Sequence, residues 1–287
     1  TGLKTNIPKK SKFYNCNIQD TKKINKILSK NKVEIVMHFA AFTDNAESIL
    51  QPKKYFKNNY LNGKEFFSNC IDNGIKRIIY SSTAAVYGNK KKKVSEKSII
   101  KPLTPYSSSK MLLEKYLEKN KKNLSCIILR YFNVAGADPQ LRCGFDVNRG
   151  KNLFLNLCHS ATKNKKFKIN GNNHNTKDGT TVRDFIHVSD LSEIHYKLSK
   201  LIIKKKIFFK LNCGYGFGFS VLEILQKFTN LSKKKINYEF VKKRKGDIIV
   251  SISNSSKLKK IINWKPKYQS LNCLVQSSLN WYKKMAK

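Results

Sequence analysis

The segment "KRIIYSSTAAVYG" (residues 76–88) decides the fold that this sequence predicts. Its apolar run, followed by hydroxyl residues and a glycine, is typical of a buried strand and the loop that leaves it. The stretch "YSSSKMLLEKYLEKN" (106–120) comes next and has the pattern of a helix. A buried strand followed by a helix indicates an α/β protein built around a parallel sheet.

The same alternation extends in both directions along the chain. Upstream, "VEIVMHFAA" (33–41) predicts a buried strand, and residues 47–73 predict a helix that ends at Asn73-Gly74. Downstream, "LSCIILRYFNVAG" (124–136) predicts a third strand with its loop. We therefore expect a doubly wound parallel sheet in the first half of the chain.

The elements after residue 150 are shorter. The pattern predicts strands near 167–170 and 208–213, a segment "VRDFIHVSDLSEIHYKLSKLI" (182–202), and helices near 152–163, 220–229, 254–262 and 271–285. We expect residues 1–150 to form a Rossmann-like domain. Residues 151–287 are expected to form a smaller C-terminal α/β lobe that binds substrate and is partly interleaved with the first domain.

The charge of the chain raises the question of a polyanion partner. The formal net charge is +40, yet only six of the 58 basic residues are arginines, and the lysines occur throughout the sequence. Specific base and phosphate contacts rely on arginine. We interpret the lysines as solvated surface and expect no specific nucleic-acid site. A non-catalytic polyanion-binding protein stays open as an alternative, recognisable by an affinity that falls steeply with salt.

The apolar runs, the cysteines and the histidines indicate the cellular location and whether a metal site is expected. No run of about 18 uncharged apolar residues occurs, so no membrane span is expected. The seven cysteines are an odd number, widely scattered, and no histidine stands at metal-ligand spacing. We expect reduced thiols, no metal and a cytoplasmic location.

The candidate chemistry begins with Tyr106 and Lys110 in "YSSSK". Residues i and i+4 share one face of a helix, and a lysine beside a tyrosine favours the phenolate. The carboxyl ends of parallel strands share one edge of a sheet. The hydroxyl of Thr83, at the end of the preceding strand, is therefore expected to join this pair.

A hydroxyl, a tyrosine and a lysine at strand ends resemble the site of the extended short-chain dehydrogenase/reductase superfamily. Three further motifs are similar to the UDP-glucose 4-epimerase family within it: "RYFNVAGA" (130–137), "DGTTVRDFIHVSDL" (178–191) and "GYGFGFSVLEI" (214–224). The resemblance implies an NAD-dependent enzyme that interconverts UDP-glucose and UDP-galactose by reversible hydride transfer through a 4-keto sugar. It extends to the N-acetylhexosamine pair if the pocket is wide enough.

The resemblance also implies roles for the three residues. Tyr106 is the acid/base, Lys110 binds the nicotinamide ribose and stabilises the phenolate, and Thr83 bonds the reacting oxygen of the sugar. A nucleotide-sugar dehydratase or decarboxylase of the same superfamily is an alternative. Dehydratases, however, have acidic residues after the threonine, where this chain has Ala84 and Ala85.

Further site residues follow from the same resemblance. The NAD contacts that it implies are Asn17, Ile18, Phe39, Ala40, Ala41, Asn59, Ser81, Tyr106, Lys110 and Tyr131. The substrate contacts that it implies are Thr83, Asn133, Asn152, Leu153, Asn170, Arg183, Arg244, Asp247 and Ser251. Among these, Arg183 and Arg244 would hold the diphosphate, because the planar donors of arginine suit it.

The chain departs from the family pattern at several positions. The glycine-rich turn that approaches the NAD pyrophosphate is absent. The resemblance therefore implies that the first two strands are missing and that these residues alone are inactive. Asn17 replaces an acidic residue beside the adenine, and Asn170 replaces an aromatic residue near the uracil. The family further implies a homodimer through paired helices of the Rossmann domain.

Overall fold

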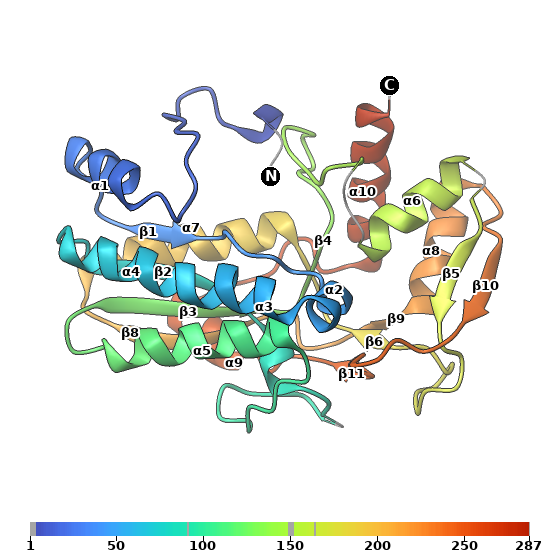
Figure 1. Ribbon diagram of the computed structural model, residues 1–287. Helices are drawn as coiled ribbons and strands as arrows, with labels where there is room; N and C mark the ends of the chain where they lie inside the picture. Colours follow the sequence, from blue (N-terminus) through green and yellow to red (C-terminus); the bar gives the residue numbers. More distant parts are fainter. Residues whose placement is uncertain (1–3, 91, 149–151, 164, 287) are drawn as a thin grey trace.

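A parallel sheet lies at the centre of the larger part of the molecule (Figure 1). The computed structural model describes residues 4–90, 92–148, 152–163 and 165–286. The four strands are β1 (Val36–His38), β2 (Arg77–Thr83), β3 (Ser125–Tyr131) and β8 (Phe208–Cys213), paired in the order β1-β2-β3-β8. All three pairings are parallel, which confirms the expected α/β architecture.

Alternation of side chains along each strand divides the core into two layers. On one face, Ile78 and Tyr80 of β2 pack with Leu113 of α5 (Pro105–Lys119) and Phe67 of α4 (Asn62–Asp72). On the other face, Ile79 of β2 and residues of β3 and β8 pack against α7 (Val188–Lys204). Figure 1 shows α4 and α5 on one side of the sheet and α7 on the other.

The start of α5 has a strong local cause. The Thr104 side chain accepts a hydrogen bond from the Ser107 N–H at 3.2 Å, and the Ser107 hydroxyl accepts one from the Thr104 N–H at 3.1 Å. This reciprocal cap is followed by Pro105 at a position where a missing N–H costs nothing. The cap places Tyr106 and Lys110 in the first turns of the helix.

The helical stretch expected at 47–73 is divided into several elements. It consists of α2 (Asn45–Leu50), α3 (Pro52–Tyr55), a π-helical turn η2 (Phe56–Leu61) and α4. Pro52 causes the first break, because proline lacks an N–H and disfavours the helical region for the residue before it. The expected end is confirmed, since Gly74 follows with a φ of +78°.

The strand expected at 33–41 is shorter than predicted. Only Val36–His38 is a strand, and Phe39 is 59% exposed. The prediction of a buried strand over all nine residues was wrong because, in the described residues, β1 pairs on one side only, with β2. Sequence periodicity also missed α1 (Thr21–Lys30), a lysine-rich helix with few apolar residues.

The smaller lobe has its own core. Phe154, Phe185, Phe228, Leu274 and Trp281 form its centre, packed between helices and short strands. Its helices are α6 (Leu153–Lys163), α8 (Val221–Ser232) and α10 (Leu271–Met285), and its parallel pair is β5 (Phe167–Asn170) with β10 (Tyr238–Val241). The remaining elements are η1 (Lys4–Asn6), η3 (Ala84–Tyr87), β4 (Asn133–Ala135), β6 (Val182–Arg183), β7 (Phe185–His187), β9 (Phe219–Ser220), β11 (Val250–Ser251) and α9 (Ser256–Ile262).

Chain order and spatial order differ at β8. This strand comes late in the sequence but pairs with β3 in the first sheet. The division that the sequence suggested at 150/151 lies outside the described residues.

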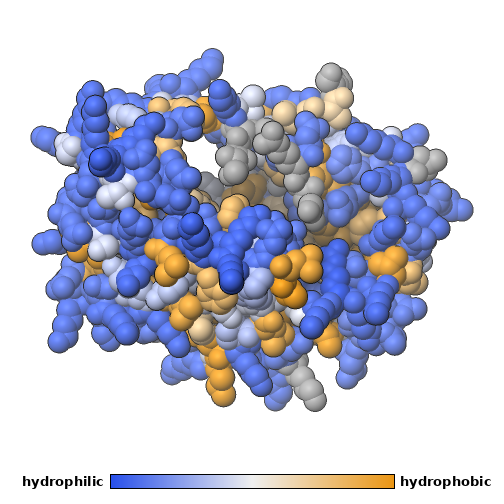
Figure 2. Space-filling model, viewed as in Figure 1, coloured by the Kyte–Doolittle hydropathy of each residue, from blue (hydrophilic) through white to orange (hydrophobic). Residues whose placement is uncertain are grey.

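The surface reflects the lysine-rich composition. Figure 2 shows hydrophilic residues over most of the visible face, with hydrophobic residues in separate small groups. Among the helices of the described residues, none has the length and apolar character needed to cross a bilayer.

Candidate active site

Helix α5 brings Tyr106 to the end of β2. The hydroxyl of Thr83 lies beside the phenol of Tyr106, which is 8% exposed. Burial raises the pKa of Tyr106, while the Thr83 hydroxyl opposes that rise because it stabilises the phenolate. Thr83 is itself fixed, since its Oγ1 accepts the Ala85 N–H at 3.2 Å. The structure thus brings together the hydroxyl and the phenol that the sequence suggested.

Lys110 lies one turn further along α5 and is 2% exposed. Burial lowers its pKa to about 7, although the nearby Glu114 carboxylate acts in the opposite direction. Its Nζ lies 4.5 Å from the centroid of the Tyr80 ring. Within the described residues, this ammonium makes no hydrogen bond or ion pair to another protein group. Its donors are therefore available to a polar ligand.

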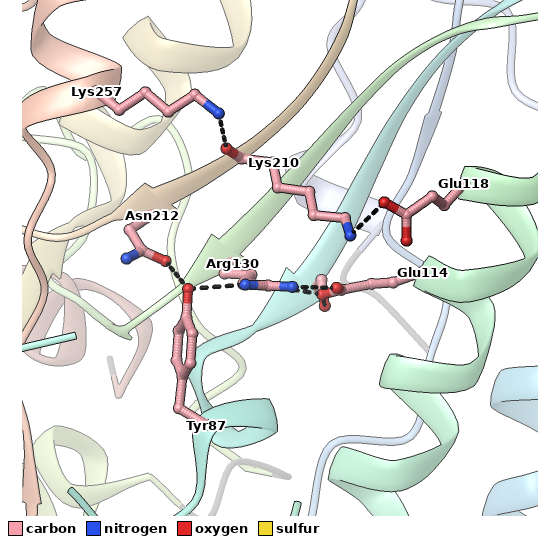
Figure 3. Close-up of polar contacts among 8 residues, drawn as sticks. Tyr87, Glu114, Glu118, Arg130, Lys210, Asn212 and Lys257 are labelled. Carbon is pink, nitrogen blue, oxygen red and sulfur yellow. Dashed lines mark hydrogen bonds and ion pairs between the residues drawn. The ribbon is translucent and has the colours of Figure 1, made fainter. Parts of the chain in front are cut away.

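A buried ion pair joins α5 to β3 immediately beyond Lys110 (Figure 3). Arg130 donates to Glu114 from Nε at 3.0 Å and from Nη2 at 2.5 Å. Its third contact is from Nη1 to the Tyr87 hydroxyl at 2.9 Å. The Ser82 hydroxyl donates to Glu114 at 2.5 Å. Tyr87 in turn donates to Asn212 of β8 at 2.7 Å, so one network connects α5 with three strands.

The loop after β1 is fixed by Asn59, whose side chain is buried in η2. Its amide oxygen accepts the Phe42 N–H, and its amide nitrogen donates to the Phe42 carbonyl, both at 2.9 Å. Ser81 donates to the carbonyl of His38 at 2.8 Å. Two of the predicted cofactor residues, Asn59 and Ser81, thus hold the chain on either side of exposed Phe39.

Tyr131 meets a histidine that the sequence gave no signal for. Its hydroxyl lies 2.6 Å from Nε2 of His195 on α7. Nδ1 of His195 lies 2.9 Å from the Leu191 carbonyl, which can only accept a hydrogen bond. Nδ1 therefore carries the hydrogen, and Tyr131 donates to Nε2. The ring of Phe39 also packs on His195, with centroids 5.2 Å apart.

The predicted phosphate-binding residues lie at the edge of the smaller lobe. Arg183 on β6 is paired with Asp247 at 2.8 Å and also donates to the carbonyls of Val182 and Ile249. Burial lowers the pKa of Arg183, although Asp247 opposes the change. Ser251 is the partner of Arg183 in the β11–β6 pairing and is half-buried.

The residue after Arg183 anchors this strand. The Asp184 carboxylate accepts the N–H groups of Tyr215 at 2.8 Å, Gly216 at 2.9 Å and Ser253 at 3.1 Å, and the Ser253 hydroxyl at 2.6 Å. Asp184 is fully buried, and burial raises its pKa. Sequence reasoning did not single it out, because its partners lie 31 to 69 residues away.

The other predicted site residues occupy element ends and loops. Asn133 opens β4 and donates its N–H to the Asp184 carbonyl at 2.9 Å, and Asn152 accepts the Leu155 N–H at 2.8 Å, just before Leu153 begins α6. Asn170 ends β5. Arg244, Ala40 and Asn17 are exposed, and Ile18 and Ala41 are half-buried. His38 and His187, interpreted as core residues, are indeed buried.

A separate cavity of about 660 Å³ lies beside β8 and holds none of the predicted site residues. Lys210 and Glu118, which pair at 2.8 Å, line it together with Lys257. The candidate active site lies elsewhere, at the carboxyl edge of the sheet, and consists of Thr83, Tyr106 and Lys110.

Comparisons with known proteins agree with this geometry. The model of the NAD dependent epimerase/dehydratase family matches residues 1–209. A UDP-glucose 4-epimerase of Lactobacillus helveticus is 34% identical over 287 residues, which covers 99% of this chain and 87% of that protein.

Two solved structures have the same fold. UDP-glucose 4-epimerase from Bifidobacterium longum, in complex with NAD+ and UDP, is 29% identical with a TM-score of 0.88, covering 94% of this chain and 82% of that one. The UDP-Glc/GlcNAc 4-epimerase of Campylobacter jejuni is 33% identical with a TM-score of 0.80, covering 96% and 85% respectively.

The buried ion pair generates a stability prediction. We expect Arg130→Met to lower the free energy of unfolding by about 3–5 kcal/mol, because it leaves the Glu114 carboxylate buried without its main partner. Chemical denaturation of the purified protein measures this loss. The matched control is Arg142→Met, which breaks a bidentate pair with Asp138 at an arginine that is 71% exposed. Equal losses from the two substitutions would contradict the assigned importance of Arg130.

Proposed function

Because this chain belongs to the NAD dependent epimerase/dehydratase family, we propose that it is a UDP-glucose 4-epimerase, which interconverts UDP-glucose and UDP-galactose. The observation that carries the proposal is the buried phenol of Tyr106 beside the Thr83 hydroxyl, with Lys110 one helical turn away. This arrangement suits proton transfer to and from a sugar hydroxyl.

The surroundings of Lys110 are compatible with a bound NAD. A buried ammonium without a carboxylate partner is costly unless a ligand supplies acceptors. Hydroxyls of the nicotinamide ribose are such acceptors, and the backbone that Asn59 and Ser81 hold lies beside the same edge of the sheet. Lys110, Ser81, Tyr131 and the loop after β1 would hold the cofactor. A bound NAD would supply the acceptor and donor of the hydride at the sugar C4.

The proton is handled by the chain itself. Tyr106 accepts the proton of the 4-hydroxyl as the C4–H bond breaks and returns it when a new C4–H bond forms on the opposite face of the 4-keto sugar, which inverts C4. Thr83 stabilises the phenolate and the reacting oxygen by hydrogen bonding, and the charge of Lys110 favours the phenolate electrostatically. No net proton is consumed, since the same phenol takes and returns it.

The substrate is held by the smaller lobe in this proposal. Arg183 supplies planar donors for the diphosphate, and Asp247 orients its guanidinium at 2.8 Å. Arg244 lies close enough to influence the pKa of Arg183, so the two cations would share the phosphates. Asn133, Asn152 and Leu153 would contact the rest of the nucleotide sugar.

The compartment and the assembly are further parts of the proposal. We propose a reducing compartment, the cytoplasm, on the support of seven free cysteines. We also propose a homodimer through α4 and α5. Its support is the apolar side chain of Leu61, which is 54% exposed at the end of η2, immediately before α4.

The acid/base role of Tyr106 gives the central test. We expect Tyr106→Phe to lower the turnover of UDP-galactose by roughly 10²-fold or more in the full-length protein, because the proton acceptor is lost. Binding of NAD and UDP should be retained. Tyr116→Phe, on the same helix, is the matched control and should keep its rate. Near-normal turnover of the Tyr106 variant, measured by a coupled UDP-glucose assay, would refute the assignment.

The width of the sugar site gives a second test. Ser251 is small and neighbours Arg183, so we expect the enzyme to accept UDP-N-acetylglucosamine as well as UDP-glucose. Ser251→Tyr should restrict activity to the plain hexose, whereas Ser251→Ala, which keeps the space, should not. Parallel assays on both sugars measure the preference. An unchanged preference in the tyrosine variant means that Ser251 does not control substrate size.

The dimer is tested by light scattering of the purified protein. We expect Leu61→Glu to convert the dimer to a monomer, because it places a charge in an apolar contact. Leu50→Glu is the control, since Leu50 is 82% exposed on α2. A dimer that survives at Leu61→Glu would place the interface elsewhere.

A further inference from the structure

The Lys110 ammonium has an aromatic ring, rather than an anion, as its close neighbour. Its Nζ lies 4.5 Å from the Tyr80 ring centroid. Glu114 is the nearest carboxylate along the helix, but its oxygens accept from Arg130 and Ser82. In the described part of the chain, Lys110 forms no ion pair.

The other groups that face Lys110 do not replace an anion. Tyr106 lies on the same helix, and burial raises its pKa. His38 on β1 has a pKa lowered to about 3 by burial and by the charge of Lys110, so its ring is neutral. Neither ring nitrogen of His38 has a hydrogen-bond partner in the described residues.

We propose that Tyr80 is a positioning residue, whose ring face holds the Lys110 ammonium by a cation–π interaction and so sets both its place and its charge state. The aromatic quadrupole attracts a cation more strongly where water is excluded. This inference rests on the proposed function in one respect only, namely that the Lys110 ammonium binds NAD. The contact itself is independent of turnover.

The ring, rather than the hydroxyl, is the active part of Tyr80. Its hydroxyl is buried and makes no hydrogen bond among the described residues. The ring is fully buried and held edge-on by Phe67, with centroids 5.8 Å apart and planes at 90°. His38 packs on it with centroids 5.8 Å apart. A ring fixed on two sides presents a rigid surface to the cation.

A fluorination series tests the quadrupole without changing the packing. Position 80 is replaced by phenylalanine and then by mono-, di- and trifluorophenylalanine, in the full-length protein. The pKa of Lys110 is followed by NMR of ¹³Cε-labelled lysine, and NAD affinity by calorimetry. Each fluorine should lower the pKa of Lys110, by about one unit over the series, because the charged form loses its attraction. NAD affinity should fall in parallel.

The control pair is Lys200 and Tyr196, with Nζ 4.3 Å from a ring that is 59% exposed. The same series at position 196 should leave the pKa of Lys110 and NAD affinity unchanged. A flat pKa of Lys110 across the series at position 80 overturns the inference, whatever the activity. A graded pKa in a protein that does not turn over UDP-sugars refutes the proposed function and leaves the role of Tyr80 intact.

Discussion

The buried pair of Arg130 and Glu114 is the interaction on which the geometry of the site depends. Arg130 is fully buried and Glu114 nearly so, and such charges are tolerated only when their hydrogen-bonding capacity is met. Ser82 and Tyr87 meet it from β2 and the turn that follows. A shift of α5 along the sheet would break these buried hydrogen bonds. The pair therefore holds Tyr106 and Lys110 of that helix in register with Thr83.

Because side chains alternate along a strand, neighbouring site residues of the sheet lie on its two opposite faces. Tyr80 and Arg130 point to the α5 face, where the proton chemistry is assigned. Tyr131, the next residue along β3, points to α7 and meets His195. Helix α5 thus presents Tyr106 and Lys110 from one face of the sheet, and Tyr131 lies on the other face, at one shared edge.

In the smaller lobe, one buried carboxylate likewise accepts hydrogen bonds from several segments. Asp184 gathers three backbone N–H groups and a hydroxyl from two distant segments, and it adjoins Arg183 in sequence. Gly214 must lack a side chain, because a Cβ there would lie 2.5 Å from the Asp184 carboxylate. The first of the three glycines of the "GYGFGFSVLEI" motif is explained by this close approach.

The sequence by itself determined the parts that depend on neighbours along the chain. Apolar runs predicted β2 and β3, the amphipathic pattern of residues 106–120 predicted α5, and the four-residue spacing of Tyr106 and Lys110 predicted a shared face. These signals are local, because a helix or strand repeats every few residues. The length of β1 was overestimated, since burial of a strand depends on partners on both sides.

Only the tertiary structure decided which groups meet across the chain. Tyr87 finds Asn212 at a separation of 125 residues, and Tyr131 finds His195 at a separation of 64. Lys110 is held against Tyr80, a residue that the sequence marked only as part of a buried strand. Periodicity specifies which face a side chain occupies, but its partner on that face depends on how distant segments pack, and the charge state of a buried lysine depends on that partner.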